Sequence, residues 1–176
     1  MKHLNVEIKA RSTNPKLVKT MLEMQQADYR GLDTQTDTYY TVPEGRLKMR
    51  EGRIENALIF YQRHDQAGPK RSDILLHKTK PDSDLKKILD QTLTVKVVVE
   101  KKRHIYFLDN VKFHLDEVTD LGTFIEIEAI DGDGSIGEER LLQQCKHYLK
   151  LFKIEDADLI ECSYSDLLLQ LNHANS

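Results

Sequence analysis

The chain has 176 residues, with 26 lysines and arginines against 29 aspartates and glutamates, so its formal net charge is −3. Charged residues make up 31% of the sequence, but their near balance argues against a general electrostatic grip on nucleic acid or an anionic membrane. No stretch approaches the roughly 18 apolar residues of a membrane-spanning helix, and the first residues lack a signal peptide's apolar segment. We therefore expect one cytoplasmic domain over residues 1–176, with Cys145 and Cys162 reduced.

Period-two alternation of apolar and polar side chains predicts that most of the chain forms short strands separated by turns. The expected strands are residues 3–11, 35–42, 46–52, 57–63, 73–80, 94–108, 111–118 and 123–130. The expected helices follow Asn14-Pro15 and Asp82-Ser83-Asp84, or lie at about 137–152 and 164–172. Since short loops join most strands, we expect antiparallel neighbours, and an even number of them can close into a barrel.

Charges on several of these strands recur at alternate positions, which places them on one face of each strand. For any single strand the ordinary interpretation is a face exposed to water. A closed site for anions and a metal is the alternative, because a like-charged strand face is costly unless it binds something. The residues that share a face are Glu7, Lys9 and Arg11; Arg46, Lys48 and Arg50; Lys101 and Arg103; and Glu126 and Glu128.

The Asp109-Asn110 turn between two apolar runs predicts a two-residue hairpin and so fixes the pairing of its strands. Arg103 should face Asp116 directly. If the following loop has about five residues, Asp116 should also lie opposite Glu126. Carboxylates placed so closely need a cation, a shared proton or solvent, and hard divalent cations prefer such oxygen clusters. His114 should point to the same side of its strand as Asp116, but a structural or surface role is the more ordinary interpretation.

Several short motifs together resemble the CYTH superfamily, which includes class IV adenylyl cyclases and thiamine triphosphatases and belongs to the triphosphate tunnel metalloenzymes. Each motif is weak alone, but their number and order cover nearly the whole chain. The matching segments are Val6-Glu7-Ile8-Lys9, Asp37-Thr38-Tyr39-Tyr40, Gly45-Arg46-Leu47-Lys48-Met49-Arg50, Tyr61-Gln62-Arg63, Val99-Glu100-Lys101-Lys102-Arg103, Leu115-Asp116-Glu117-Val118, Leu121-Gly122-Thr123-Phe124-Ile125-Glu126-Ile127-Glu128 and Ser163-Tyr164-Ser165-Asp166-Leu167-Leu168.

The resemblance implies an α+β, mainly β fold, in which an eight-stranded antiparallel closed barrel with flanking helices forms a tunnel for a triphosphate. It also implies Mg²⁺ or Mn²⁺ as cofactor. The implied metal ligands are Glu7, Asp116, Glu126 and Glu128. The implied triphosphate ligands are Lys9, Arg11, Arg46, Lys48, Arg50, Arg63, Lys78, Lys101 and Arg103, of which Lys9, Arg63 and Lys101 would also act in catalysis.

One position departs from the family pattern, because Asn5 stands where the family has its first glutamate. An amide oxygen can bind a hard cation but brings no negative charge, so a second metal would be absent or bound more weakly.

The resemblance implies a class IV adenylyl cyclase-like activity that converts ATP to cyclic AMP and pyrophosphate. A triphosphatase acting on thiamine triphosphate or inorganic triphosphate is the close alternative, and a non-catalytic binder of nucleotide or polyphosphate is a third. The expected partner is a small triphosphate molecule, with no nucleic acid and no membrane, and the protein would be a monomer or a homodimer. Asp131-Gly132-Asp133-Gly134 resembles the start of a calcium loop, but the later ligands are missing, so we interpret it as a turn.

Overall fold

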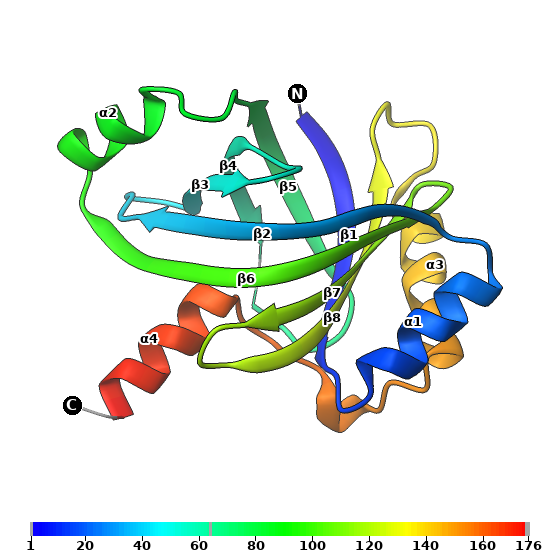
Figure 1. The fold of residues 1–176 in the computed structure, drawn as a ribbon. Helices are drawn as coiled ribbons and strands as arrows, with labels where there is room; N and C mark the ends of the chain where they lie inside the picture. Colours follow the sequence, from blue (N-terminus) through cyan, green and yellow to red (C-terminus); the bar gives the residue numbers. More distant parts are fainter. Residues whose placement is uncertain (1, 64, 175–176) are drawn as a thin grey trace.

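The computed structural model describes residues 2–63 and 65–174, which form a closed barrel of eight antiparallel strands with four α-helices around it (Figure 1). The strands are β1 (Lys2–Arg11), β2 (Asp28–Tyr40), β3 (Arg46–Gly52), β4 (Ala57–Arg63), β5 (Lys70–Lys78), β6 (Val95–Leu108), β7 (Val111–Val118) and β8 (Gly122–Asp131). The helices are α1 (Pro15–Met24), α2 (Leu85–Thr92), α3 (Glu138–Leu151) and α4 (Tyr164–Ala174). Around the barrel the strand order is β1-β5-β4-β3-β2-β6-β7-β8, which confirms the expected fold class.

Most elements lie close to where the sequence pattern places them, and the largest difference is at the start of β2. Asn14 caps α1 as expected, because its side chain accepts a hydrogen bond of 3.1 Å from the Leu17 amide. Strand β2 begins at Asp28, earlier than the expected residue 35, because its first half pairs with the long strand β6. Gly31 interrupts that pairing with a positive φ, which hides the period-two signal in the sequence.

The hairpin between β6 and β7 has the predicted register, with Arg103 opposite Asp116. The prediction that Asp116 lies opposite Glu126 is wrong, because the next loop is shorter than five residues. Val118 pairs directly with Gly122, so Glu126 faces His114. Asp120 and Gly122 allow this tight turn by adopting φ values of 64° and 96°.

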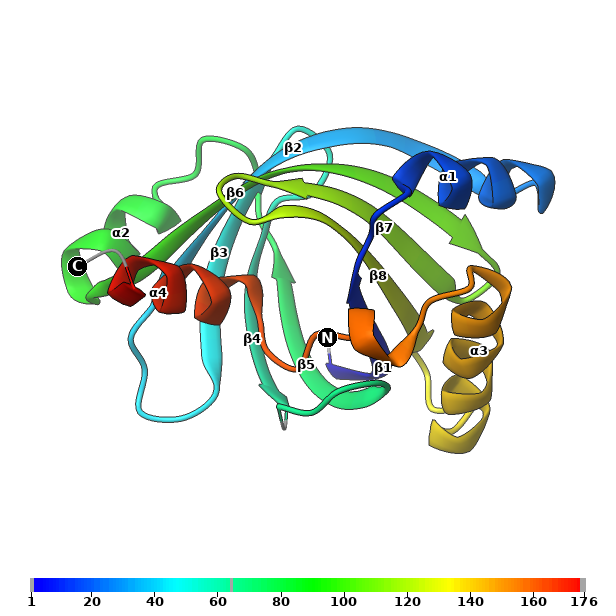
Figure 2. The same ribbon diagram turned by 90° about the horizontal axis from the view of Figure 1, so that it is seen from below.

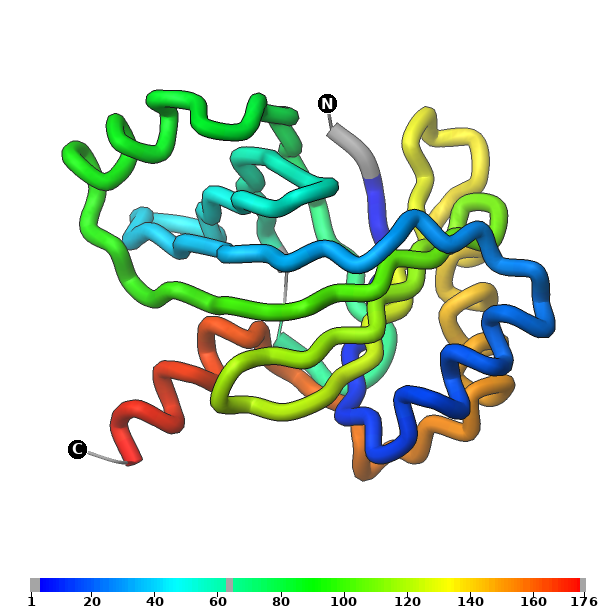
Figure 3. The backbone as a smooth tube through the Cα atoms, in the orientation of Figure 1, coloured from blue at the N-terminus to red at the C-terminus, as the bar shows by residue number. Residues whose placement is uncertain are grey.

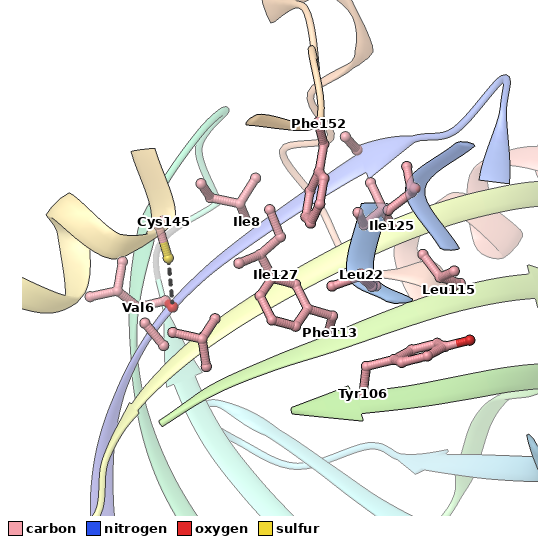
Figure 4. Close-up of a cluster of buried hydrophobic side chains, with 14 of the residues drawn as sticks. Val6, Ile8, Leu22, Tyr106, Phe113, Leu115, Ile125, Ile127, Cys145 and Phe152 are labelled. Carbon is pink, nitrogen blue, oxygen red and sulfur yellow. Dashed lines mark hydrogen bonds between the residues drawn. The ribbon is translucent and has the colours of Figure 1, made fainter. Parts of the chain in front are cut away.

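The main hydrophobic core lies outside the barrel, between β1, β7 and β8 and the helices α1 and α3. These two helices cover one side of the barrel, while α2 and α4 lie on the other (Figure 2). Val6 and Ile8 of β1 point toward this core, where Phe113 packs edge-on against Phe152 (Figure 4). Cys145 is buried in the same cluster, and its Sγ lies 3.2 Å from the Val6 carbonyl oxygen.

Because successive side chains of a strand point to opposite faces, packing the apolar residues outward turns the charged residues into the barrel. Buried polar side chains at alternate positions show this on β1, where Asn5, Glu7 and Lys9 are each at most 6% exposed. The C-terminal segment passes beside the barrel and enters α4 next to β6 (Figure 3). None of the helices described has both the length and the apolar character that a membrane crossing requires.

Candidate functional site

The barrel encloses a cavity of about 880 Å³, within the range typical of ligand-binding pockets. Every strand contributes side chains to its lining, and so do the loop between β3 and β4 and the first turn of α4. The lining residues include Glu7, Lys9, Lys48, Arg50, Lys78, Lys101, Arg103, Glu126 and Glu128, which were expected from the sequence.

Asp37 on β2 gathers three of the basic side chains into one cluster. Its carboxylate accepts hydrogen bonds from Lys48 at 3.0 Å, from Lys101 at 2.7 Å and from Arg50 at 2.8 and 3.0 Å. Burial alone would raise the pKa of Asp37, but Arg50, Lys101 and Lys48 hold it well below its ordinary value. One carboxylate thus holds three cations close together, although it neutralises only one of their charges.

Lys101 is the most perturbed cation of this cluster. Burial lowers the pKa of Lys101 to about 7, and the neighbouring Arg50 and Arg103 act in the same direction against the opposing effect of Asp37. The protonated form is therefore poorly compensated, and an incoming anion would stabilise it.

A second cluster surrounds Glu126 on β8. Its carboxylate contacts Lys9 at 3.0 Å, Arg103 at 2.9 Å and His114 at 3.2 Å. Burial would raise the pKa of Glu126, but Lys9, His114 and Arg103 hold it well below its ordinary value. The ammonium of Lys9 also lies 4.0 Å from the centre of the Tyr164 ring, which fixes its direction into the cavity.

Arg103 and Asp116 form the direct cross-strand pair that the hairpin predicts, with hydrogen bonds of 2.7 and 2.6 Å. Asp116 accepts a further bond of 2.7 Å from the Tyr164 hydroxyl. Asp116 is not among the residues that line the cavity, so its side chain serves to orient Arg103.

The donor set on β7 and β8 fits a divalent cation. Ligand atoms of His114, Glu126 and Glu128 lie within 4.8 Å of one another, and Glu7 of β1 pairs with Glu128 in the barrel. His114 is 1% exposed, and its Nε2 has no hydrogen-bond partner among the described residues. Burial and the charges of Arg103 and Lys112 lower the pKa of His114, which keeps the imidazole neutral and able to bind a metal. The carboxylates suit Mg²⁺ or Mn²⁺, whereas an imidazole nitrogen suits a transition metal and so favours Mn²⁺ of the two.

Other residues expected at the site lie outside this cavity or at its edge. Arg46 binds Asp65 and Asp166 at 2.8 and 3.1 Å and lines a separate surface pocket. Arg11 is exposed, and its guanidinium donates to the Leu121 carbonyl oxygen at 3.1 Å. The side chain of Arg63 lies outside the described residues.

Asn5, in contrast, lines the cavity. It is 2% exposed and has an Oδ1 without a hydrogen-bond partner among the described residues.

The charged residues of the cavity that were not expected at the site from the sequence are Asp37, Arg53, Glu55 and Lys112. Lys112 lies on β7 and alternates with His114 and Asp116, so all three point to the same side of the strand. The period-two pattern that identified the other two residues could therefore have identified Lys112 as well. Glu55 comes from the loop between β3 and β4, where no periodicity indicates which way a side chain points.

One wall of the cavity is apolar. Ala57 and Ile59 of β4 lie beside Ile74 and Leu76 of β5, and Ile59 pairs with Leu76. In the strand order, β4 and β5 stand across the barrel from β6 and β7, which carry basic residues such as Lys101. The cavity therefore presents an apolar surface opposite a cationic one.

A family comparison matches the CYTH domain over residues 3–160. A search of curated proteins finds no match to the chain. Solved structures with the same architecture include the PH1012 protein from Pyrococcus horikoshii, which is 22% identical with a TM-score of 0.78 over 93% of this chain and 98% of that one.

Other solved structures of this architecture include two proteins that are named for an activity. A proposed adenylate cyclase from Vibrio parahaemolyticus is 21% identical, with a TM-score of 0.73 over 94% of this chain and 97% of that one. A proposed adenylyl cyclase from Hippeastrum, for which a dominant triphosphatase activity is stated, is 13% identical, with a TM-score of 0.62 over 95% and 94% of the two chains. Identities this low show a shared fold alone.

Proposed function

The chain belongs to the CYTH domain family, and on that basis we propose that it is a divalent-metal-dependent enzyme acting on an organic triphosphate. The leading reaction is the conversion of ATP to cyclic AMP and pyrophosphate. The observation that carries this proposal is the cavity with two unlike walls, cationic on β6 and β7 and apolar on β4 and β5. A phosphate chain suits the first wall, and a planar organic group suits the second.

Binding of the phosphate chain falls to the basic side chains that already converge in the cavity. Lys48, Arg50 and Lys101 are held together by one carboxylate, and Lys9 and Arg103 by another. Phosphate oxygens add negative charge where cations outnumber their partners, so each ammonium and guanidinium gains a hydrogen-bond acceptor. These cations then stabilise the charge that develops on the phosphoryl oxygens during transfer.

His114, Glu126 and Glu128 are the residues proposed to hold the divalent cation, with Glu7 beside them. When bound, such an ion neutralises phosphate charge and polarises a phosphoryl oxygen. Asp116 acts through Arg103, whose guanidinium it orients, and is proposed as a positioning residue. Glu126 would contact both the metal ion and the phosphate-binding cations, because it also pairs with Lys9 and Arg103.

Cyclisation requires the substrate to fold so that its 3′-hydroxyl approaches the innermost phosphorus as pyrophosphate leaves. The facing walls favour this geometry, because the organic group can lie inside the barrel beside the phosphate chain. Ile59 and Ile74 supply the apolar contact, while Lys101 lies on the opposite side for the phosphates.

Hydrolysis is the second candidate, in which water attacks the terminal phosphorus, the bond to the remaining diphosphate breaks, and inorganic phosphate is released. The structural likeness to the Hippeastrum protein, for which a dominant triphosphatase activity is stated, favours this alternative. The same cations would hold the chain in either reaction, so the products must distinguish the two.

The test is to incubate the purified protein with ATP, thiamine triphosphate and inorganic triphosphate in the presence of Mg²⁺ or Mn²⁺ and to identify the products. Cyclic AMP with pyrophosphate supports the cyclase, and released phosphate supports the triphosphatase. Binding of ATP by calorimetry without turnover leaves a non-catalytic nucleotide binder. Absence of both binding and turnover with all three compounds would overturn the proposal.

A further inference from the structure

The loop between β3 and β4 is fixed to the barrel by its own backbone. The carboxylate of Asp33, which is fully buried, accepts hydrogen bonds from the amides of Arg53, Ile54 and Glu55 at 2.6, 2.9 and 2.9 Å. Asn56 closes the same loop by bonding the backbone of Gly52 at both its amide and its carbonyl. A loop held in this way presents its side chains in set directions.

Glu55 is the residue that this loop directs into the cavity. Its carboxylate contacts Arg50 at 3.0 Å and the Gln35 amide at 3.2 Å, and it forms an ion pair with Lys112. Burial alone would raise the pKa of Glu55, but Lys112 and Arg50 hold it below its ordinary value, so the side chain carries its charge at neutral pH.

The ion pair between Glu55 and Lys112 crosses one end of the barrel. Lys112 lies on β7, and both β2 and β6 stand between β7 and β3 in the strand order. Lys112 is near the start of β7, whereas Asp116, which contacts Tyr164 of α4, is near its end. Glu55 and Tyr164 thus mark the two ends of the charged stretch of the cavity.

We propose that Glu55 is an end stop that limits the phosphate chain bound in the barrel to the length of a triphosphate. Its carboxylate pairs with Lys112, the cation that a longer chain would reach after Arg50, and it also contacts Arg50. A fourth phosphoryl group would have to displace this carboxylate or lie against a fixed negative charge. The inference rests on the proposed function, because it requires a phosphate chain to bind along the cationic wall.

Calorimetric titration of Glu55→Gln with inorganic triphosphate and inorganic tetraphosphate, in parallel with the wild type, tests the end stop. Glutamine keeps the shape, and its one oxygen can still accept hydrogen bonds from Arg50 and Gln35, while the bond from Lys112 to the other carboxylate oxygen is lost. The loop itself stays held by Asp33 and Asn56. We expect the wild type to bind triphosphate more tightly. In the variant, the ratio of tetraphosphate affinity to triphosphate affinity should be about tenfold higher than in the wild type. A gain of this size is typical of one charge-assisted hydrogen bond.

Two further variants sharpen the result. Glu44→Gln removes one carboxylate from the exposed loop between β2 and β3, outside the cavity lining, and should leave the ratio of the two affinities unchanged. Lys112→Met removes the partner of Glu55 and leaves its charge less compensated, so discrimination against tetraphosphate should increase.

The end stop would be overturned if Glu55→Gln changed the affinities for triphosphate and tetraphosphate equally. It would also be overturned if Glu44→Gln changed their ratio as much as Glu55→Gln does. Failure of the wild type to bind either inorganic chain would also overturn it, while binding and turnover of ATP decide the proposed function separately.

Discussion

Tyr164, the first residue of α4, donates a hydrogen bond of 2.7 Å to the buried carboxylate of Asp116 on β7. The Tyr164 ring is 4% exposed and also packs against Phe124 of β8. Burial and the charges of Asp116 and Glu126 raise the pKa of Tyr164 well above its ordinary value, so its hydroxyl stays a donor. The C-terminal helix is thereby tied to the residue that orients Arg103.

Tyr164→Phe removes this hydrogen bond and keeps the ring. We expect a loss of about 1–2 kcal/mol in the free energy of unfolding, because a bond to a buried carboxylate is lost while Arg103 still compensates its charge. KM for the triphosphate should rise more than kcat falls, since Arg103 loses part of its orientation. Urea denaturation and steady-state kinetics measure the two effects, and Tyr40→Phe, which removes a bond to Asp90 near α2, is the matched control. An unchanged KM would contradict the link between α4 and Arg103.

Glu128→Gln removes one charged ligand from the proposed metal set and is cleaner than Glu126→Gln, because Glu126 also pairs with Lys9 and Arg103. We expect the affinity for Mn²⁺, measured without substrate by calorimetry or electron paramagnetic resonance, to fall about tenfold or more. Glu117→Gln, on the outer face of β7, should leave it unchanged. The double variant Glu126→Gln with Glu128→Gln should lose metal-dependent activity, and unchanged metal dependence would refute the acidic cluster.

Triphosphate affinity should depend on pH through Lys101, whose pKa burial lowers to about 7. Bound phosphate favours the charged ammonium and raises this pKa, so the protein takes up a proton on binding when the free lysine is neutral. Affinity should therefore fall as the pH rises above about 7, and about one proton should be taken up near pH 8. Calorimetry in buffers of different ionisation enthalpy counts the protons. Lys101→Met should abolish the uptake, and its persistence would assign the titration elsewhere.

Ile74→Ala shortens one side chain of the apolar wall without changing a charge. We expect affinity for ATP to fall about fivefold, since several methylene contacts are lost. Affinity for inorganic triphosphate should stay unchanged, because that chain has no organic group to contact β5. Leu75→Ala, whose side chain is 51% exposed on the other face of β5, is the control. An equal loss for both ligands would show that the wall acts on cavity shape and not on an organic group.

Local signals in the sequence were enough to predict most of the strands and one of the ion pairs, while the closed barrel was implied by the family resemblance. The Asp109-Asn110 turn fixes the pairing of Arg103 with Asp116, because a two-residue hairpin leaves no freedom of register. Alternation then identifies which side chains share the inner face, and Lys102 is exposed as that pattern requires.

Contacts between distant strands could not be predicted. Nothing in the local pattern indicates that Asp37 lies within reach of Lys101, which is far along the chain on β6. The register of β8 was missed because left-handed turn conformations at Asp120 and Gly122 shorten its loop. Glu55 was missed because loop side chains carry no periodic signal, and its direction depends on the bonds that Asp33 makes with the backbone.

The placement of the main hydrophobic core between the barrel and α1 and α3 has a consequence for how such a protein can change. Residues that fold the chain, such as Phe113, and residues that line the cavity, such as Ile74, point in opposite directions from the sheet. Substitutions of cavity residues that take part in no buried ion pair therefore leave the packing between the barrel and these two helices in place. Directed evolution toward new substrates should begin at such positions, where a change in the cavity and a change in this core are separate events.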